Sequence, residues 1–121
     1  MKMINNEIYS NAIALQKAFA ETVTLPVKVN FYLQKNKAVL SELSREIEES
    51  RVAILQKYGT LNNETNQFEF SKENGQTVMK ELNELFDLEQ DVKIYTVKIE
   101  DFGDNLTLTT EQMEALMFMI D

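Results

Sequence analysis

The feature that most constrains this chain is a run of helix-compatible residues from Lys28 to Tyr58. No proline or glycine interrupts it, because the only proline is Pro26 and Gly59 comes directly after the run. Its seam residues step by three or four positions, the near-heptad spacing of a packed helix, and they are Leu33, Asn36, Leu40, Leu43, Ile47, Ser50, Ile54 and Tyr58. Gly59 stands where a left-handed glycine commonly ends a helix. At 1.5 Å per residue such a helix spans roughly 45 Å, against a radius of gyration of about 14 Å for a compact chain of this size. We therefore predict a helix over 28–58, part of which projects or packs on something else.

Shorter elements are predicted on either side of this helix. Residues 1–20 contain a first helix, since Ile8, Ala12, Leu15 and Phe19 share one helical face, and residues 1–4 are a candidate for a short edge strand. Phe68 and Phe70 alternate as in a strand. A third helix over 71–88 begins at Ser71, a residue type favoured as an N-cap.

The last part of the chain, residues 91–121, is predicted to contain an acidic β segment followed by a helix. Residues 91–100 are rich in β-formers, and residues 106–108 could pair with them as a hairpin. The sequence from Thr109 to Gln112 fits a capping box that opens the C-terminal helix. With 121 residues, the chain is predicted to be one domain. The predicted fold class is α+β: a helix-rich single domain, residues 1–121, with one long central helix and a small antiparallel sheet.

Several classes of chemistry lack their usual residues. The chain contains no cysteine and no histidine, which removes thiolate nucleophiles, the commonest general base and the commonest metal ligand. The carboxylates around Gly103 do not match the spacing of a calcium loop. The sequence also has no Gly-rich phosphate loop and no nucleophile elbow. We therefore predict a protein that is not an enzyme and has no catalytic residues, no cofactor and no metal site.

The charge of the chain is unevenly distributed. Residues 1–83 carry ten basic and ten acidic side chains, whereas residues 84–121 carry ten acidic residues against Lys93 and Lys98. An acidic surface repels phosphates, so nucleic acid is not an expected partner, and it attracts basic protein surfaces. The alternative interpretation is that these carboxylates only keep the domain soluble. No apolar stretch is long enough to span a membrane and no signal-peptide pattern opens the chain, so a membrane is not an expected partner.

The acidic segment and the C-terminal helix supply the candidate partner-binding residues. Aromatic and methionine side chains are enriched at the centres of interfaces, and carboxylates would steer a basic partner. The candidates are Tyr95, Glu100, Asp101, Phe102, Asp104, Phe118 and Met119. Met113 and Met117 fit a role in the core better, although either Met117 or Phe118 could contact a partner.

The long helix is also a candidate for self-association. Asn36 and Ser50 are polar at seam positions, and a polar seam residue can set the register between two helices. The candidate self-association residues are Asn36, Leu40, Leu43 and Ile47. The alternative, that these positions lie at an intramolecular interface, stays open at this point.

The sequence resembles a group of small proteins encoded by tailed phages and prophages of low-GC Gram-positive bacteria. The shared strings are residues 25–31 (LPVKVNF), Lys35-Asn36, the helix ending QKYG at 56–59, and the C-terminal pattern of Leu108-Thr109, Met113 and 116–120 (LMFMI). The resemblance implies a protein made in the cytoplasm of an infected bacterium, and it carries no catalytic motif. Our hypothesis is an accessory protein that binds a host protein, including an antiviral defence protein, or a phage protein, and blocks or modulates it. The alternative is an oligomeric structural or assembly component of the virion.

Overall fold

The computed structural model describes residues 1–21, 23–104 and 107–121, and it is a single α+β domain dominated by one long helix. The three longest helices lie close to their predicted bounds, and the predicted small antiparallel pairing is present as two separate strand pairs. The elements are β1 (Lys2–Ile4), α1 (Asn5–Ala18), α2 (Val27–Tyr58), β2 (Thr60–Asn62), β3 (Gln67–Glu69), α3 (Lys72–Asp87), β4 (Glu89–Asp91), the 3-10 turn η1 (Ile99–Phe102), α4 (Thr110–Leu116) and the 3-10 turn η2 (Met117–Met119).

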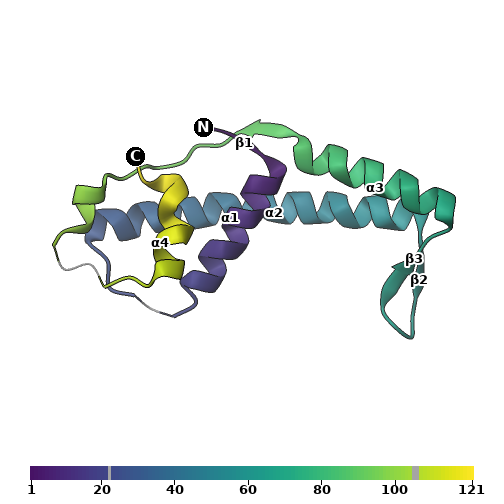
Figure 1. Cartoon of the computed structure of the whole chain (residues 1–121), viewed down its shortest axis with the longest axis horizontal. Helices are drawn as coiled ribbons and strands as arrows, with labels where there is room; N and C mark the ends of the chain where they lie inside the picture. Colours follow the sequence, from purple (N-terminus) through teal and green to yellow (C-terminus); the bar gives the residue numbers. More distant parts are fainter. Residues whose placement is uncertain (22, 105–106) are drawn as a thin grey trace.

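The molecule is elongated along α2, and the two halves of this helix have different neighbours (Figure 1). The half from Val27 to Ile47 supports α1, α4 and the extended segment that follows β4, which together form what we call the body. The half from Glu48 to Tyr58 packs against α3, and the β2–β3 hairpin closes this pair of helices at the far end. We call residues 48–87 the arm.

Burial along α2 differs between the half that belongs to the body and the half that belongs to the arm. Its buried residues are Val29, Leu33, Asn36, Leu40 and Ile47, and none of its residues after Ile47 is fully buried. The predicted seam is therefore correct as far as Ile47, and the helix then continues into the arm. Most of the core is contributed by the body; its other buried hydrophobic residues are Met3, Ile8, Leu15, Val92, Val97, Phe102, Ala115, Leu116 and Met119.

The starts of α3 and α4 follow local sequence signals, whereas the end of α2 differs from its prediction. Ser71 accepts a hydrogen bond from the Asn74 N–H at 3.1 Å, as predicted for an N-cap. Thr109 and Gln112 form the predicted capping box, with reciprocal hydrogen bonds of 3.1 and 2.9 Å. The left-handed conformation predicted for Gly59 is wrong, since its φ is −117°. The reason for a glycine is space: a Cβ there would lie 2.5 Å from the Phe70 ring and 2.9 Å from the Leu55 carbonyl oxygen.

The strands form two separate antiparallel pairs that do not belong to a common sheet. β1 pairs with β4, so that Met3 lies opposite Gln90, and β2 pairs with β3 as a hairpin. The candidate edge strand at the start of the chain is thereby confirmed. Asn5 fixes the junction of β1 and α1 to the end of α3, because its buried side-chain amide donates to the Leu85 carbonyl at 2.8 Å and accepts from Gln90 at 2.6 Å.

The strand predicted over residues 91–100 is largely wrong. Only Asp91 belongs to a strand, and Val97 forms an isolated bridge to Ile120. The β-forming residues do have an extended backbone, but its hydrogen-bonding groups are satisfied by other partners: Val92 by Met1, Tyr95 by the Asn36 side chain, and Val97 by Met119 and Asp121. In the hairpin predicted for residues 106–108, Leu106 lies outside the described residues, and 107–108 are not in a strand.

Candidate functional site

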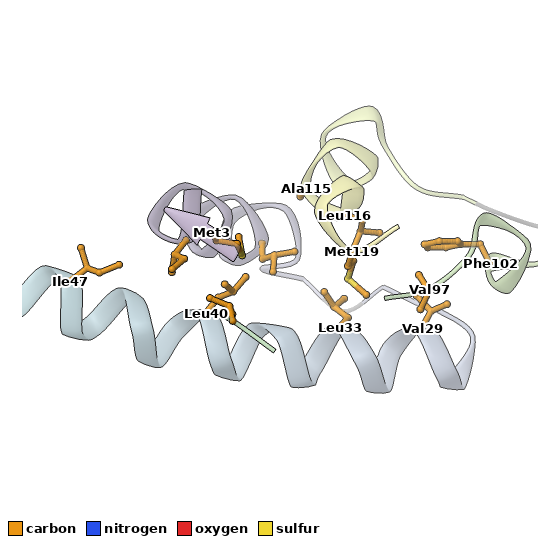
Figure 2. Packing of buried hydrophobic residues seen from close by; sticks show 13 residues of the cluster. Met3, Val29, Leu33, Leu40, Ile47, Val97, Phe102, Ala115, Leu116 and Met119 are labelled. Atoms are coloured by element: carbon orange, nitrogen blue, oxygen red, sulfur yellow. The ribbon is translucent and has the colours of Figure 1, made fainter. Parts of the chain in front are cut away.

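The four candidate self-association residues belong to the intramolecular interface instead. Asn36 and Leu40 are completely buried, Ile47 is 3 % exposed, and Leu43 is partly buried against the core. The seam faces α1, the extended segment after β4 and η2 (Figure 2). The alternative left open by the sequence is thus the correct one for Asn36, Leu40 and Ile47. A second copy cannot reach them in this fold.

Two of the candidate partner-binding residues are also core residues. Phe102 is 4 % exposed and Met119 is completely buried; in Figure 2 the Phe102 ring extends toward the other buried side chains and Met119 points toward α2. The prediction that they anchor a partner is wrong, because η1 and η2 turn these side chains inward. The expectation of a core role for Met117 is likewise wrong, since Met117 is 61 % exposed. Phe118 is partly buried against the core.

The acidic candidates are close together, but they do not have equivalent roles. The Asp101 carboxylate accepts a hydrogen bond from the Lys98 N–H at 2.8 Å and forms an ion pair with the Lys28 ammonium at 3.2 Å. These two donors lower the pKa of Asp101, the backbone N–H having the larger effect. Asp101 therefore caps η1 and ties it to α2, whereas Glu100 and Asp104 are exposed.

Tyr95, the remaining candidate, lies in a cluster of aromatic rings and lysines that we call the aromatic–lysine patch. The patch comprises Lys28, Phe31, Tyr32, Lys35, Lys93 and Tyr95. The ring centroids of Tyr32 and Tyr95 are 5.3 Å apart, and those of Phe31 and Tyr32 are 6.2 Å apart.

Each of the three rings in the patch is approached by a lysine. The Nζ atom of Lys28 lies 5.9 Å from the Tyr32 centroid, that of Lys35 lies 5.4 Å from Phe31, and that of Lys93 lies 5.3 Å from Tyr95. These distances are in the range of cation–π contacts, which contribute about 0.5–1 kcal/mol each at exposed sites. The patch is therefore a mixed surface of exposed charge and partly exposed aromatic area.

Helical spacing and one buried side chain assemble the patch. Lys28, Phe31 and Lys35 are three and four residues apart, so they lie on the same face of α2. Asn36 then holds the other segment in place: its amide donates to the Tyr95 carbonyl at 2.9 Å and accepts from the Tyr95 N–H at 2.8 Å. The seam residue proposed for self-association thus positions Tyr95 and its neighbour Lys93 beside α2.

Sequence reasoning found only Tyr95 of this patch. The signal that could have revealed the patch is the local distribution of acidic residues, since none occurs in residues 23–41 or in residues 92–99. Summing charge over residues 1–83 and 84–121 obscures both stretches. What the sequence alone does not indicate is that they lie side by side.

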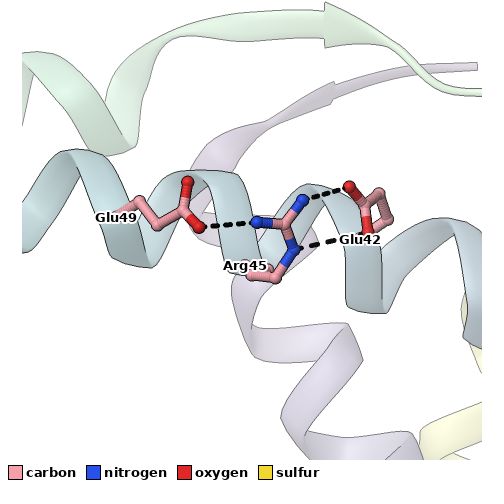
Figure 3. Close-up of polar contacts among 3 residues, drawn as sticks. All are labelled: Glu42, Arg45 and Glu49. Atoms are coloured by element: carbon pink, nitrogen blue, oxygen red, sulfur yellow. Dashed lines mark hydrogen bonds and ion pairs between the residues drawn. The ribbon is translucent and has the colours of Figure 1, made fainter.

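An open groove of about 350 Å³ lies between α1 and α2, and its walls include Tyr9, Ile13, Ser44, Arg45 and Glu48. Its ionisable groups are paired with one another or with neighbours on α2. Arg45 bridges Glu42 and Glu49 (Figure 3). Glu48 accepts hydrogen bonds from Arg51 at 2.6 Å and from the Tyr9 hydroxyl at 3.0 Å.

These contacts give the groove no acid or base poised near neutral pH. The bond from Arg51, followed by that from Tyr9, lowers the pKa of Glu48, and partial burial with the Glu48 bond raises that of Tyr9. Catalytic carboxylates usually show the opposite shift. We therefore regard the aromatic–lysine patch as the better candidate site.

Across residues 1–21, 23–104 and 107–121, no three potential ligands among His, Cys, Asp and Glu come together as a metal site. No helix in the described part of the chain is long and apolar enough to cross a membrane. No model of a known protein family matches the sequence, and comparisons with curated proteins and with solved structures return no match.

Proposed function

We propose that this chain is a non-enzymatic protein-binding module and that the aromatic–lysine patch is its recognition surface. The observation that carries the proposal is the exposure of Phe31, an aromatic residue that is 55 % accessible among Lys28, Lys35 and Lys93. Large aromatic side chains supply most of the binding energy in protein interfaces when they are surrounded by a polar rim. Here the lysines form that rim.

The biological setting that we propose follows the resemblance to phage proteins. The chain would act in the cytoplasm of an infected bacterium, where it would bind a host protein, such as an antiviral defence factor, or a phage protein and block or modulate it. Blocking requires only that the module occupies a surface that the target needs. A small domain with an exposed aromatic anchor is sufficient for that mechanism.

Two serine variants test the proposal. Phe31→Ser removes the aromatic anchor, and Met79→Ser is its matched control, because both residues lie on helices and they are 55 % and 60 % exposed. Tagged proteins would be recovered from infected host cells, and the captured protein would then be purified and its binding measured by calorimetry. We expect Phe31→Ser to weaken binding by at least about 10-fold, the effect of losing an anchor worth more than 1.4 kcal/mol. Equal affinities of the two variants would contradict the proposed surface.

A second candidate function is an oligomeric structural or assembly component of the virion. It is favoured by the apolar residues that the arm exposes, namely Met79 at 60 % and Leu61 at 44 %. Self-association through the arm would bury them, whereas the seam residues up to Ile47 are already used internally. Sedimentation equilibrium of the wild type and of Met79→Glu tests this alternative. A wild-type protein that is monomeric at all concentrations would exclude it.

A further inference from the structure

The lysines of this acidic chain are concentrated where acidic residues are missing. The chain has a net charge of −8, with 12 basic and 20 acidic residues. Residues 23–41 and 92–99 nevertheless contain no acidic residue and five lysines: Lys28, Lys35, Lys37, Lys93 and Lys98. All of the acidic side chains are therefore located in the rest of the chain.

The fold brings these two acid-free segments together. The paired hydrogen bonds between Asn36 and the Tyr95 backbone place the middle of one segment against the middle of the other. The contact between the Tyr32 and Tyr95 rings continues the same junction toward the surface. Lysines from both segments, namely Lys28, Lys35 and Lys93, consequently lie over one group of aromatic rings.

Two of the three lysines of the aromatic–lysine patch are available to an incoming anion. Lys28 is already paired with Asp101 at 3.2 Å. Within the described part of the chain, by contrast, neither Lys35 nor Lys93 has a carboxylate at ion-pair distance, and both are exposed. Each instead rests over a ring of the patch. Ammonium groups held on aromatic faces remain free to donate to a carboxylate.

From this arrangement we infer that the aromatic–lysine patch binds an acidic segment of the partner protein, in which aspartate or glutamate side chains pair with Lys35 and Lys93 beside an apolar residue packed on Phe31. The inference rests on the proposed function and adds the chemistry of the partner. It also reverses the sequence-based prediction of a basic partner. That prediction depended on Glu100, Asp101 and Asp104, of which Asp101 is occupied by Lys28 and Lys98.

A protein segment fits this surface better than a nucleic acid does. Binding of single strands requires an extended positive groove that follows the phosphate backbone, whereas the lysines of the patch are gathered around three rings. A phosphate backbone that continued beyond the patch would also meet the exposed carboxylates of Glu100 and Asp104, which follow Lys98 in the chain. A short acidic segment avoids both problems.

The test uses purified full-length protein and four fluorescent probes. One is a peptide rich in Asp and Glu that contains a phenylalanine; the others are its Asn/Gln counterpart, its Lys/Arg counterpart and a thymidine oligonucleotide. The binding variant is Lys35→Gln/Lys93→Gln. Its control is Lys72→Gln/Lys80→Gln, which makes the same change in net charge on exposed positions of α3.

We expect the acidic peptide to bind the wild type more tightly than the other three probes do, with an affinity that decreases as salt increases. Each exposed lysine contributes a few-fold in affinity, so the Lys35→Gln/Lys93→Gln variant should bind about 3- to 20-fold more weakly. The Lys72→Gln/Lys80→Gln variant should bind like the wild type.

Other results would overturn the inference in distinguishable ways. Equal loss in the two variants would show a general charge effect without a site. Tighter binding of the basic peptide or of the oligonucleotide would identify another class of partner. If Phe31→Ser loses its captured partner while the acidic peptide fails to bind, the protein-binding function stands and the acidic chemistry is refuted.

Discussion

Replacing Asn36 by leucine separates the two roles that the sequence allows for this residue. If the seam of α2 joined two copies, Asn36→Leu would strengthen association and change the oligomeric mass. In the structure described above, Asn36 is completely buried and its amide is hydrogen-bonded to both polar groups of the Tyr95 backbone. We therefore expect a less stable protein with an unchanged mass.

The magnitude follows from the groups that would be left without partners. Leucine has the same branching and the same number of side-chain heavy atoms as asparagine, although it is bulkier, so the seam stays filled. The Tyr95 N–H and carbonyl, however, lose their partner. Each unsatisfied buried group costs about 1–3 kcal/mol, and the greater hydrophobicity of leucine offsets about 1 kcal/mol of the total. The net loss in the free energy of unfolding is thus about 1–5 kcal/mol, compared with the 5–15 kcal/mol typical of a domain.

Urea denaturation followed by circular dichroism measures this loss, and sedimentation measures the mass. The matched control is Ser50→Leu, the same replacement at the other polar seam position; Ser50 is exposed, and the expected change is within about 0.5 kcal/mol. The reasoning would be refuted if Asn36→Leu were as stable as the wild type, or if its mass doubled.

Three other substitutions test the packing and the electrostatics. Leu40→Ala should cost about 2–5 kcal/mol in urea denaturation, because Leu40 is completely buried in the body; a loss below 1 kcal/mol, within the usual range for surface sites, would argue against this core. Gly59→Ala should destabilise the protein by about 1–3 kcal/mol through the clash with Phe70 and the Leu55 carbonyl, and hydrogen exchange should increase in the arm before the body. For Glu48, whose pKa is lowered by Arg51 and Tyr9, the stabilisation is complete above the unfolded-state pKa of about 4.3 and is lost as the pH falls through the lower folded-state pKa. The difference in unfolding free energy between wild type and Glu48→Gln should therefore be at most about 1 kcal/mol near neutral pH, since the pair is partly exposed, and vanish in acid; a difference independent of pH would exclude the ionic contribution.

Local signals in the sequence predicted most of the helices and their ends. The absence of proline and glycine defines α2, and Ser71, Thr109 and Gln112 act through neighbours three residues away. The segment after β4 was predicted less well because its partners are distant in the sequence. The backbone N–H and carbonyl of Tyr95 are hydrogen-bonded to a side chain, that of Asn36, and not to a neighbouring strand. A pattern of β-forming residues predicts an extended segment, but it does not show whether another strand lies beside it.

The site was harder to predict than the fold for a related reason. Aromatic and methionine residues near the C-terminus look alike in the sequence, yet Met117 is exposed and Met119 is buried because η2 places them on opposite sides. Phe31 lies two residues from both Val29 and Leu33, off the spacing of the helix seam, and its ring is largely exposed. Only the position of Lys93 and Tyr95 beside α2 turns Phe31 into part of a surface patch.

The hydrogen bonds of residues 92–97 have a consequence for the order in which the protein can fold during synthesis. Val92 bonds with Met1, and Val97 bonds with Met119 and Asp121, so this one stretch joins both ends of the described chain. The arm, by contrast, is made of residues 48–87, which are close in sequence and leave the ribosome together. The arm can therefore form while translation continues, whereas the body, including the position of Lys93 and Tyr95, is completed only after residue 121 has emerged.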